Sequence, residues 1–167
     1  MRAFHLSFFL FSIAFLGCSN VPDGFPKVVP CTATITDNGQ PVSGASVLVN
    51  TVPPTSGLTV SGDSDEQGKV VFTTIFSGHS VPGVPVGNLV MTIFKEPHVP
   101  DWKSAEEIEQ MGYNEAMAYS AEKSARRARL PRIVPTALNN PSTSPVTIEA
   151  VDKKPLDWQV KLEDYRK

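Results

Sequence analysis

The sequence has few of the residues from which enzyme sites are commonly built. Only three histidines and two cysteines occur among 167 residues. The histidines (His5, His79 and His98) are not spaced as paired metal ligands, and neither HExxH nor HxxE is present. The G-x-S-x-G pattern of serine hydrolases and the phosphate-binding glycine loops are also missing. We therefore expect no metal, no cofactor and no catalytic centre, with His79 and His98 solvated in loops.

Charge of either sign is also scarce. Charged residues make up 19% of the chain, and the net charge is −2. This balance argues against nucleic acid as a partner, because such proteins carry a basic excess. Proline, by contrast, is frequent, with 15 residues. High proline combined with many Val, Thr and Ser residues is typical of a β-sandwich with many corners, and the length suits one such domain behind a leader.

One long apolar run, Ala3 to Leu16, lies directly after Arg2. It is shorter than the roughly 20 residues that a helix needs to cross a bilayer, and it ends in small residues. These features predict a signal peptide over residues 1–17. The segment Phe15-Leu16-Gly17-Cys18 resembles the bacterial lipobox. That resemblance implies a lipoprotein in which Cys18 becomes the first mature residue and carries acyl chains such as palmitate.

A second interpretation of the two cysteines stays open. If cleavage is ordinary and lies further upstream, Cys18 could pair with Cys31 in an oxidising compartment. In the lipoprotein interpretation Cys31 is a lone thiol, and it shares an alternating face with Ala33 and Ile35, so we expect it to be a buried small residue. Between the cysteines, residues 18–30 are rich in proline and predict an extended tether without regular structure.

The rest of the chain alternates apolar and polar residues in short runs that are separated by turn residues. Asn38-Gly39 predicts a tight hairpin turn, because both residues tolerate positive φ. Gln67-Gly68 predicts a second turn, and Trp158 is expected to be a core residue of the last strand. About seven short strands with proline and glycine corners indicate an all-β sandwich. The expected strands are residues 31–36, 45–51, 58–61, 69–74, 86–94, 145–151 and 157–162.

Two motifs in this order carry a family resemblance. They are Gly39-Gln-Pro-Val-Ser-Gly-Ala-Ser-Val47 and Asp65-Glu-Gln-Gly-Lys-Val-Val-Phe72. Together with Val86–Ile93 and Leu138–Ile148 they resemble the carboxypeptidase regulatory-like domain of bacterial lipoproteins. The resemblance implies a seven-stranded, transthyretin-like (prealbumin/Ig-like) β-sandwich over residues 31–167. Ala33 departs from the family, which usually has glycine in the first strand.

A helical insertion is predicted before the last two strands, at about residues 102–130. Ser104 and Glu107 have the spacing of a capping box. Acidic residues gather at the start of this segment and basic residues at its end, which suits the helix dipole. Gly112 is expected to kink the helix, and Pro131 to end it. The basic end supplies candidate contacts to a partner or an anionic surface, namely Arg126, Arg127 and Arg129.

These observations favour a non-catalytic binding or structural protein of the bacterial cell envelope. It would be held to the membrane through its lipid anchor, facing the periplasm or exposed on the cell surface. Its other partner would be an envelope protein or a glycan, and not nucleic acid. Two alternatives stay open. One is a small hydrolase of the transthyretin-like type that uses residues around His79 or the Tyr165-Arg166 tail. The other is a subunit that adds an exposed edge strand to an envelope complex.

Overall fold

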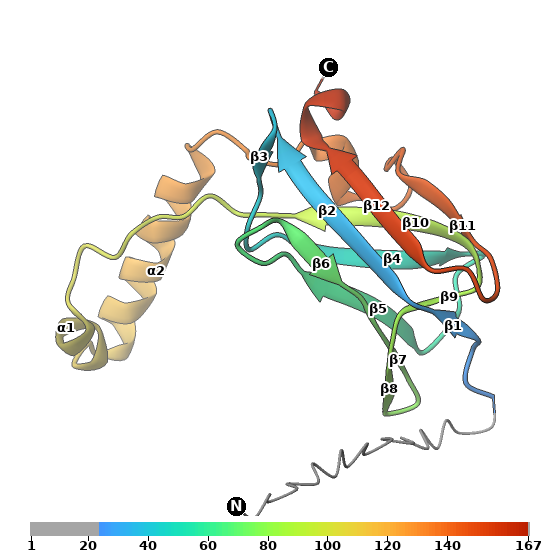
Figure 1. The fold of residues 1–167 in the computed structure, drawn as a ribbon. Coiled ribbons are helices and arrows are strands. Elements are labelled where there is room, and N and C mark those ends of the chain that lie inside the picture. The colour runs from blue at the N-terminus through green and yellow to red at the C-terminus, as the bar shows by residue number, and fades with distance from the viewer. Residues whose placement is uncertain (1–23, 167) are drawn as a thin grey trace, which may run out of the picture.

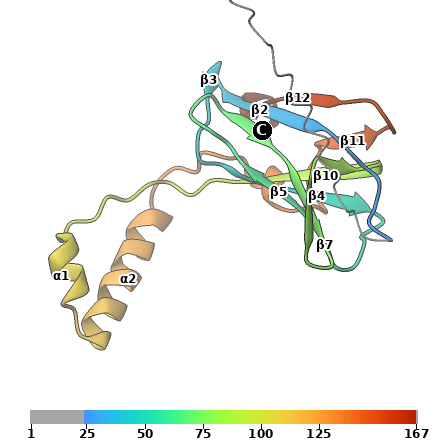
Figure 2. The same cartoon turned by 60° about the horizontal axis from the view of Figure 1, so that its bottom comes forward.

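The computed structural model describes residues 24–166. Two β-sheets face each other across a common core, and a helical arm stands away from them (Figure 1). A view turned by 60° shows the same separation of arm and sheets (Figure 2). The all-β, sandwich-like architecture predicted from the alternating runs is confirmed. The predicted lipidation site, Cys18, lies outside the described residues.

The larger sheet has six strands in the order β11-β10-β4-β5-β7-β8, and each neighbouring pair is antiparallel. Its strands are β4 (Ser46–Val52), β5 (Leu58–Asp63), β7 (Thr73–Phe76), β8 (His79–Pro82), β10 (Gly87–Phe94) and β11 (Thr147–Ala150). The smaller sheet is built on β2, which pairs with three other strands. Its strands are β2 (Cys31–Asp37), β3 (Gln40–Pro41), β6 (Lys69–Val71) and β12 (Leu156–Lys161).

The core lies where the inward faces of the two sheets meet. In β2 every second residue is buried, as the period of two requires, and this inward face carries Cys31, Ala33 and Ile35. The larger sheet contributes Val47 from β4 and Met91 from β10 to the same core, together with their buried neighbours. The Asn38-Gly39 turn that leads from β2 to β3 has positive φ at both residues, 49° and 77°, as predicted.

The strand predicted over residues 69–74 is wrong as a single element. Residues 69–71 form β6 in the smaller sheet, and residues 73–76 form β7 in the larger one. Phe72 is the crossing point, and its side chain is fully buried (0% exposed). The backbone at this position is shared between the sheets, since Phe72 N donates to Cys31 O and Gly83 N donates to Phe72 O. A continuous apolar alternation cannot reveal such a change of sheet, because both halves keep the same period.

The last strand, β12, runs parallel to β2, whereas β3 and β6 pair with β2 antiparallel, so the smaller sheet is mixed. Its register places Trp158 beside Ala33. The Trp158 ring is half-buried and packs edge-on against Phe72, with ring centroids 6.4 Å apart. Trp158 therefore borders the core, as predicted for an anchor of the last strand.

Two segments expected to lack regular structure contain strands. The tether was predicted over residues 18–30, but β1 (Val28–Val29) pairs with β9 (Val84–Pro85), and Val29 is buried at 1% exposure. The sandwich thus begins before Cys31. His79 was predicted to lie in a loop, but it begins β8, an edge strand of the larger sheet. His98 is exposed outside regular structure, as expected.

Cys31 is a free thiol and is buried, which confirms its prediction as a small core residue. Burial, with a smaller contribution from the Asp157 carboxylate, raises the pKa of this thiol to about 12. A protonated thiol at neutral pH is a poor nucleophile and a poor metal ligand. Cys31 is therefore suited to packing and not to chemistry.

Candidate functional site

The helical arm, residues 98–130, is the feature that the sandwich itself does not explain. It follows β10 and contains α1 (Ala105–Glu109) and α2 (Tyr113–Ala128). The predicted capping box is present, because Glu107 N donates to Ser104 Oγ and Ser104 N donates to the Glu107 carboxylate. The two bonds hold the pKa of Glu107 below its usual value. The helical insertion predicted at about residues 102–130 is present, but at Gly112, where a kink was expected, the chain breaks into two helices and Gly112 becomes the N-cap of α2.

Asp101 ties the segment before α1 to the middle of α2. Its Oδ1 atom accepts a hydrogen bond from Tyr119 Oη at 2.7 Å and another from Lys123 Nζ. The Lys123 bond, followed by the Tyr119 bond, lowers the pKa of Asp101 below its ordinary value. Desolvation and the bond to Asp101 raise the pKa of Tyr119. One carboxylate thus joins two donors that lie one helical turn apart on the same face of α2.

Stacking and ion pairs extend this contact along the helix. The Trp102 ring lies 4.5 Å from the Tyr119 ring, and the Arg126 guanidinium sits 4.0 Å from the centroid of Trp102. Lys103 Nζ pairs with the Glu115 carboxylate at 2.6 Å. Each exposed pair of this kind contributes at most about 1 kcal/mol, so it is the number of contacts on one face that fixes the geometry of the arm.

We expect Asp101→Asn to loosen the arm without unfolding the sandwich. The amide keeps the size of the side chain but loses the charge that attracts Lys123. Hydrogen exchange of the α2 amides should become several-fold faster, while that of β4 and β10 should not change. Asp164→Asn is the matched control, because Asp164 is an exposed aspartate that forms no ion pair with any of residues 24–166. Unchanged exchange in α2 would show that Asp101 does not hold the arm.

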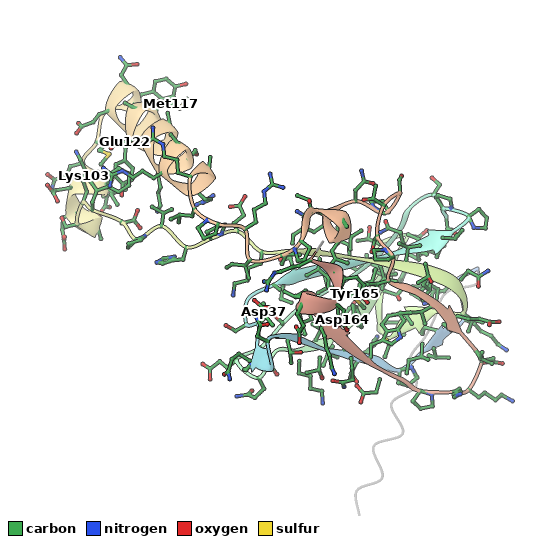
Figure 3. All side chains as sticks on the ribbon, turned by 90° about the horizontal axis from the view of Figure 1, so that it is seen from above. Asp37, Lys103, Met117, Glu122, Asp164 and Tyr165 are labelled. Atoms are coloured by element: carbon green, nitrogen blue, oxygen red, sulfur yellow. The ribbon has the colours of Figure 1, made fainter. Side chains whose placement is uncertain are left out.

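The opposite face of α2 carries no charge. At 100° per residue, all five charged residues of the helix fall within about 140° of its circumference, on the side that meets the entering segment. The other side is exposed and includes Tyr113, 80% exposed, and Met117, 56% exposed. Neither helix of the arm buries a residue. Figure 3 shows Lys103, Met117 and Glu122 on the arm, away from the sandwich.

The three predicted contact residues lie at the root of the arm, where α2 ends. Arg126 pairs with Glu122 at 2.7 Å and also covers Trp102. Arg127 pairs with Glu96. Arg129, the C-cap residue, is exposed and forms no ion pair within the described residues. The charge that sequence reasoning assigned to a partner is thus partly neutralised by Glu122 and Glu96. The i,i+4 spacing of Glu122 and Arg126 is visible in the sequence, whereas the contact of Arg127 with Glu96 is not.

The residues that a hydrolase would use are not brought together. His79 lies in the β7–β8 hairpin, and Arg166 lies beyond β12 at the opposite end of the sandwich (Figure 1). The Arg166 guanidinium holds the Asp37 carboxylate through two bonds of 2.6 Å and also donates to Ile133 O. This carboxylate raises the pKa of Arg166. Arg166 therefore fastens the C-terminus to the β2–β3 hairpin.

The pockets of the described chain are shallow and contain few reactive groups. One of about 770 Å³ lies beside the C-terminal residues, and its charged lining residues are Arg132, Asp164 and Arg166. Figure 3 labels Asp164 and Tyr165, two residues of its lining. Another, of about 460 Å³, lies at the root of the arm. Two of its lining residues, Arg127 and Asn139, each have a buried polar atom without a hydrogen-bond partner. The second pocket is lined by both Ser124 and Lys95, but Lys95 Nζ donates to Ser43 O, and no hydrogen bond joins it to Ser124. The first pocket has no histidine, cysteine or lysine in its lining.

Residues 24–166 contain no group of three His, Cys, Asp or Glu side chains with the geometry of a metal site. The Asp65 carboxylate, in the second predicted turn, accepts hydrogen bonds from the backbone amides of Gln67 and Lys69 and so stabilises this turn. In the same part of the chain, every helix is too short or too polar to span a bilayer. These findings leave the outer face of the arm as the candidate functional site.

The chain matches no known protein-family model, and no curated protein shows significant sequence similarity to it.

Proposed function

We propose that this protein is a non-catalytic lipoprotein of the bacterial envelope that presents its helical arm to a binding partner. Acylation of Cys18 would hold the chain on the membrane, and residues 19–27 would separate the lipid from the sandwich. The β-sandwich would be a transthyretin-like domain of the carboxypeptidase regulatory-like type. The ordered motifs between Gly39 and Phe72 and the two-sheet architecture support this assignment.

One observation carries the binding function: the arm adds nothing to the sandwich core. The cluster of buried core residues contains no residue between Ile93 and Ile133. The arm nevertheless has a defined structure, held by Asp101, Trp102 and their partners on α2. A segment that is ordered by its own contacts and does not stabilise its domain is best explained by a contact outside the domain.

The positions of the polar residues support a non-catalytic role. Among residues 24–166, the groups with hydrolytic potential are far apart, as with His79 and Arg166, or are engaged, as with Asp37 and Asp65. A catalytic constellation requires an acid, a base and a pocket within hydrogen-bond reach of one another.

Site-specific crosslinking in intact cells tests the proposal. A photoreactive amino acid at Met117 should form an adduct with a defined partner. The same amino acid at Val71, which is 60% exposed on the sandwich, should form several-fold less. Both positions are exposed to a similar degree and would carry the same photoreactive side chain, so the pair is matched for accessibility. Equal crosslinking from both positions, or none from Met117, would contradict the arm as the binding surface.

A further inference from the structure

The free charges of the arm lie at opposite ends. Glu106 and Glu109 belong to α1 at its tip, and Arg129 and Arg132 lie at its root. All four side chains are exposed, and none forms an ion pair with any of residues 24–166. Between these ends runs the uncharged outer face of α2, about 24 Å long over its 16 residues. The arm thus has an acidic tip, a neutral middle and a basic root.

When two arms lie antiparallel, the acidic tip of each one lies beside the basic root of the other, so the charges are complementary. We propose that α2 packs antiparallel against α2 of a second copy, so that the tip of each arm meets the root of the other. Such a contact is isologous and closes as a two-fold dimer. The inference rests on the proposed function, because it names the partner of the same outer face.

The antiparallel arrangement fixes which residues meet. Pairing the two ends of α2 places Tyr113 opposite Ala128 of the second copy, and Met117 opposite Ser124. The two-fold axis then passes between Ser120 and Ala121, so Ala121 lies within about one residue of its own counterpart along the helix. The large side chains of one helix therefore meet the small ones of the other, which lets two helices approach to the usual 8–10 Å.

The charges favour a second copy over an unrelated helix. In the dimer the two free carboxylates at the tip of each arm meet the two free guanidinium groups at the root of the other arm. One sequence therefore supplies both halves of the charge complementarity. A single helix pair of this length buries less than the roughly 1,200 Å² of a standard interface. We therefore expect a weak dimer in dilute solution, one that co-anchoring in a membrane strengthens by raising the effective concentration.

Cysteine crosslinking of the full-length, membrane-attached protein tests the geometry. Ala121→Cys should give a disulfide-linked dimer on mild oxidation, because symmetry brings the two thiols together. Val71→Cys is the control: Val71 is also exposed but lies on the sandwich, and its dimer should be about tenfold less abundant. The buried Cys31 does not interfere. Equal dimer formation by the two variants would overturn the proposal.

A charge swap tests the partner. Glu106→Lys with Glu109→Lys should weaken dimerisation about tenfold, since like charges then meet at both ends. Arg129→Glu with Arg132→Glu should do the same. The chain that carries all four substitutions should dimerise again like the unmodified protein, because the complementarity is restored within one sequence. Failure of this rescue would rule out self-pairing.

The proposed dimer and the proposed binding role of the arm predict different crosslinking results. A photo-adduct from Met117 with a different protein, while Ala121→Cys stays monomeric, would preserve the binding role and overturn the second copy as partner. No adduct of any kind from Met117 would overturn both.

Discussion

Replacing Phe72 with alanine is expected to lower the free energy of unfolding by about 3–5 kcal/mol, the usual cost of removing a fully buried aromatic ring. Phe72 is 0% exposed and sits where the chain leaves the smaller sheet for the larger one. Its ring also meets Trp158 edge-on. The substitution opens a cavity between the sheets at the position that joins them. Because a domain of this size is stable by only about 5–15 kcal/mol, much of the stability would be lost.

Urea denaturation followed by Trp fluorescence measures this loss. Val71→Ala is the matched control, because Val71 is the preceding residue but points to solvent, and its change should stay within about 0.5 kcal/mol. A loss below about 1 kcal/mol for Phe72→Ala would mean that the ring does not fill the space between the sheets.

Replacing Cys18 with alanine is expected to release the protein from the membrane. Without the thiol no diacylglycerol can be attached. The membrane-bound share should fall about tenfold or more, since two or three acyl chains make a stable anchor at about 0.8 kcal/mol for each buried CH₂. Cell fractionation and metabolic labelling with an alkyne analogue of palmitate measure the result.

Cys31→Ala is the control for the second cysteine. Cys31 is buried within the sandwich, so its replacement should leave both the label and the membrane attachment unchanged. Mass spectrometry of the mature N-terminus decides between the two interpretations of the cysteine pair. An unmodified Cys18 thiol, or a Cys18–Cys31 disulfide, would remove the lipid anchor from the proposed function.

The proposed lipid anchor and the proposed contact between arms predict a linked effect. Anchoring would confine the chains to a surface, and confinement favours weak contacts between them. Cys18→Ala should therefore also reduce the crosslinking of Ala121→Cys, although it leaves the arm unaltered. The lipid and the arm would then both contribute to dimerisation, with the sandwich as the rigid spacer between them.

The sequence by itself determined the features that depend on near neighbours in the chain. The Asn38-Gly39 turn, the capping box of Ser104 and Glu107, and the inward face of β2 followed from local backbone preferences and a period of two. The position of the helices before the last two strands followed from this capping box and from the acidic-to-basic order of the charges.

Only the tertiary structure decided which distant segments meet. The crossing of Phe72 between sheets, the parallel pairing of β12 with β2, and the pairing of β1 with β9 join residues whose contact no local pattern records. The same holds for the arm, where Glu96 and Asp101 neutralise Arg127 and Lys123, and Tyr113 and Met117 are left exposed. The physical reason is that strand pairing and charge neutralisation depend on proximity in space, whereas turns, caps and periodicity depend on proximity along the chain.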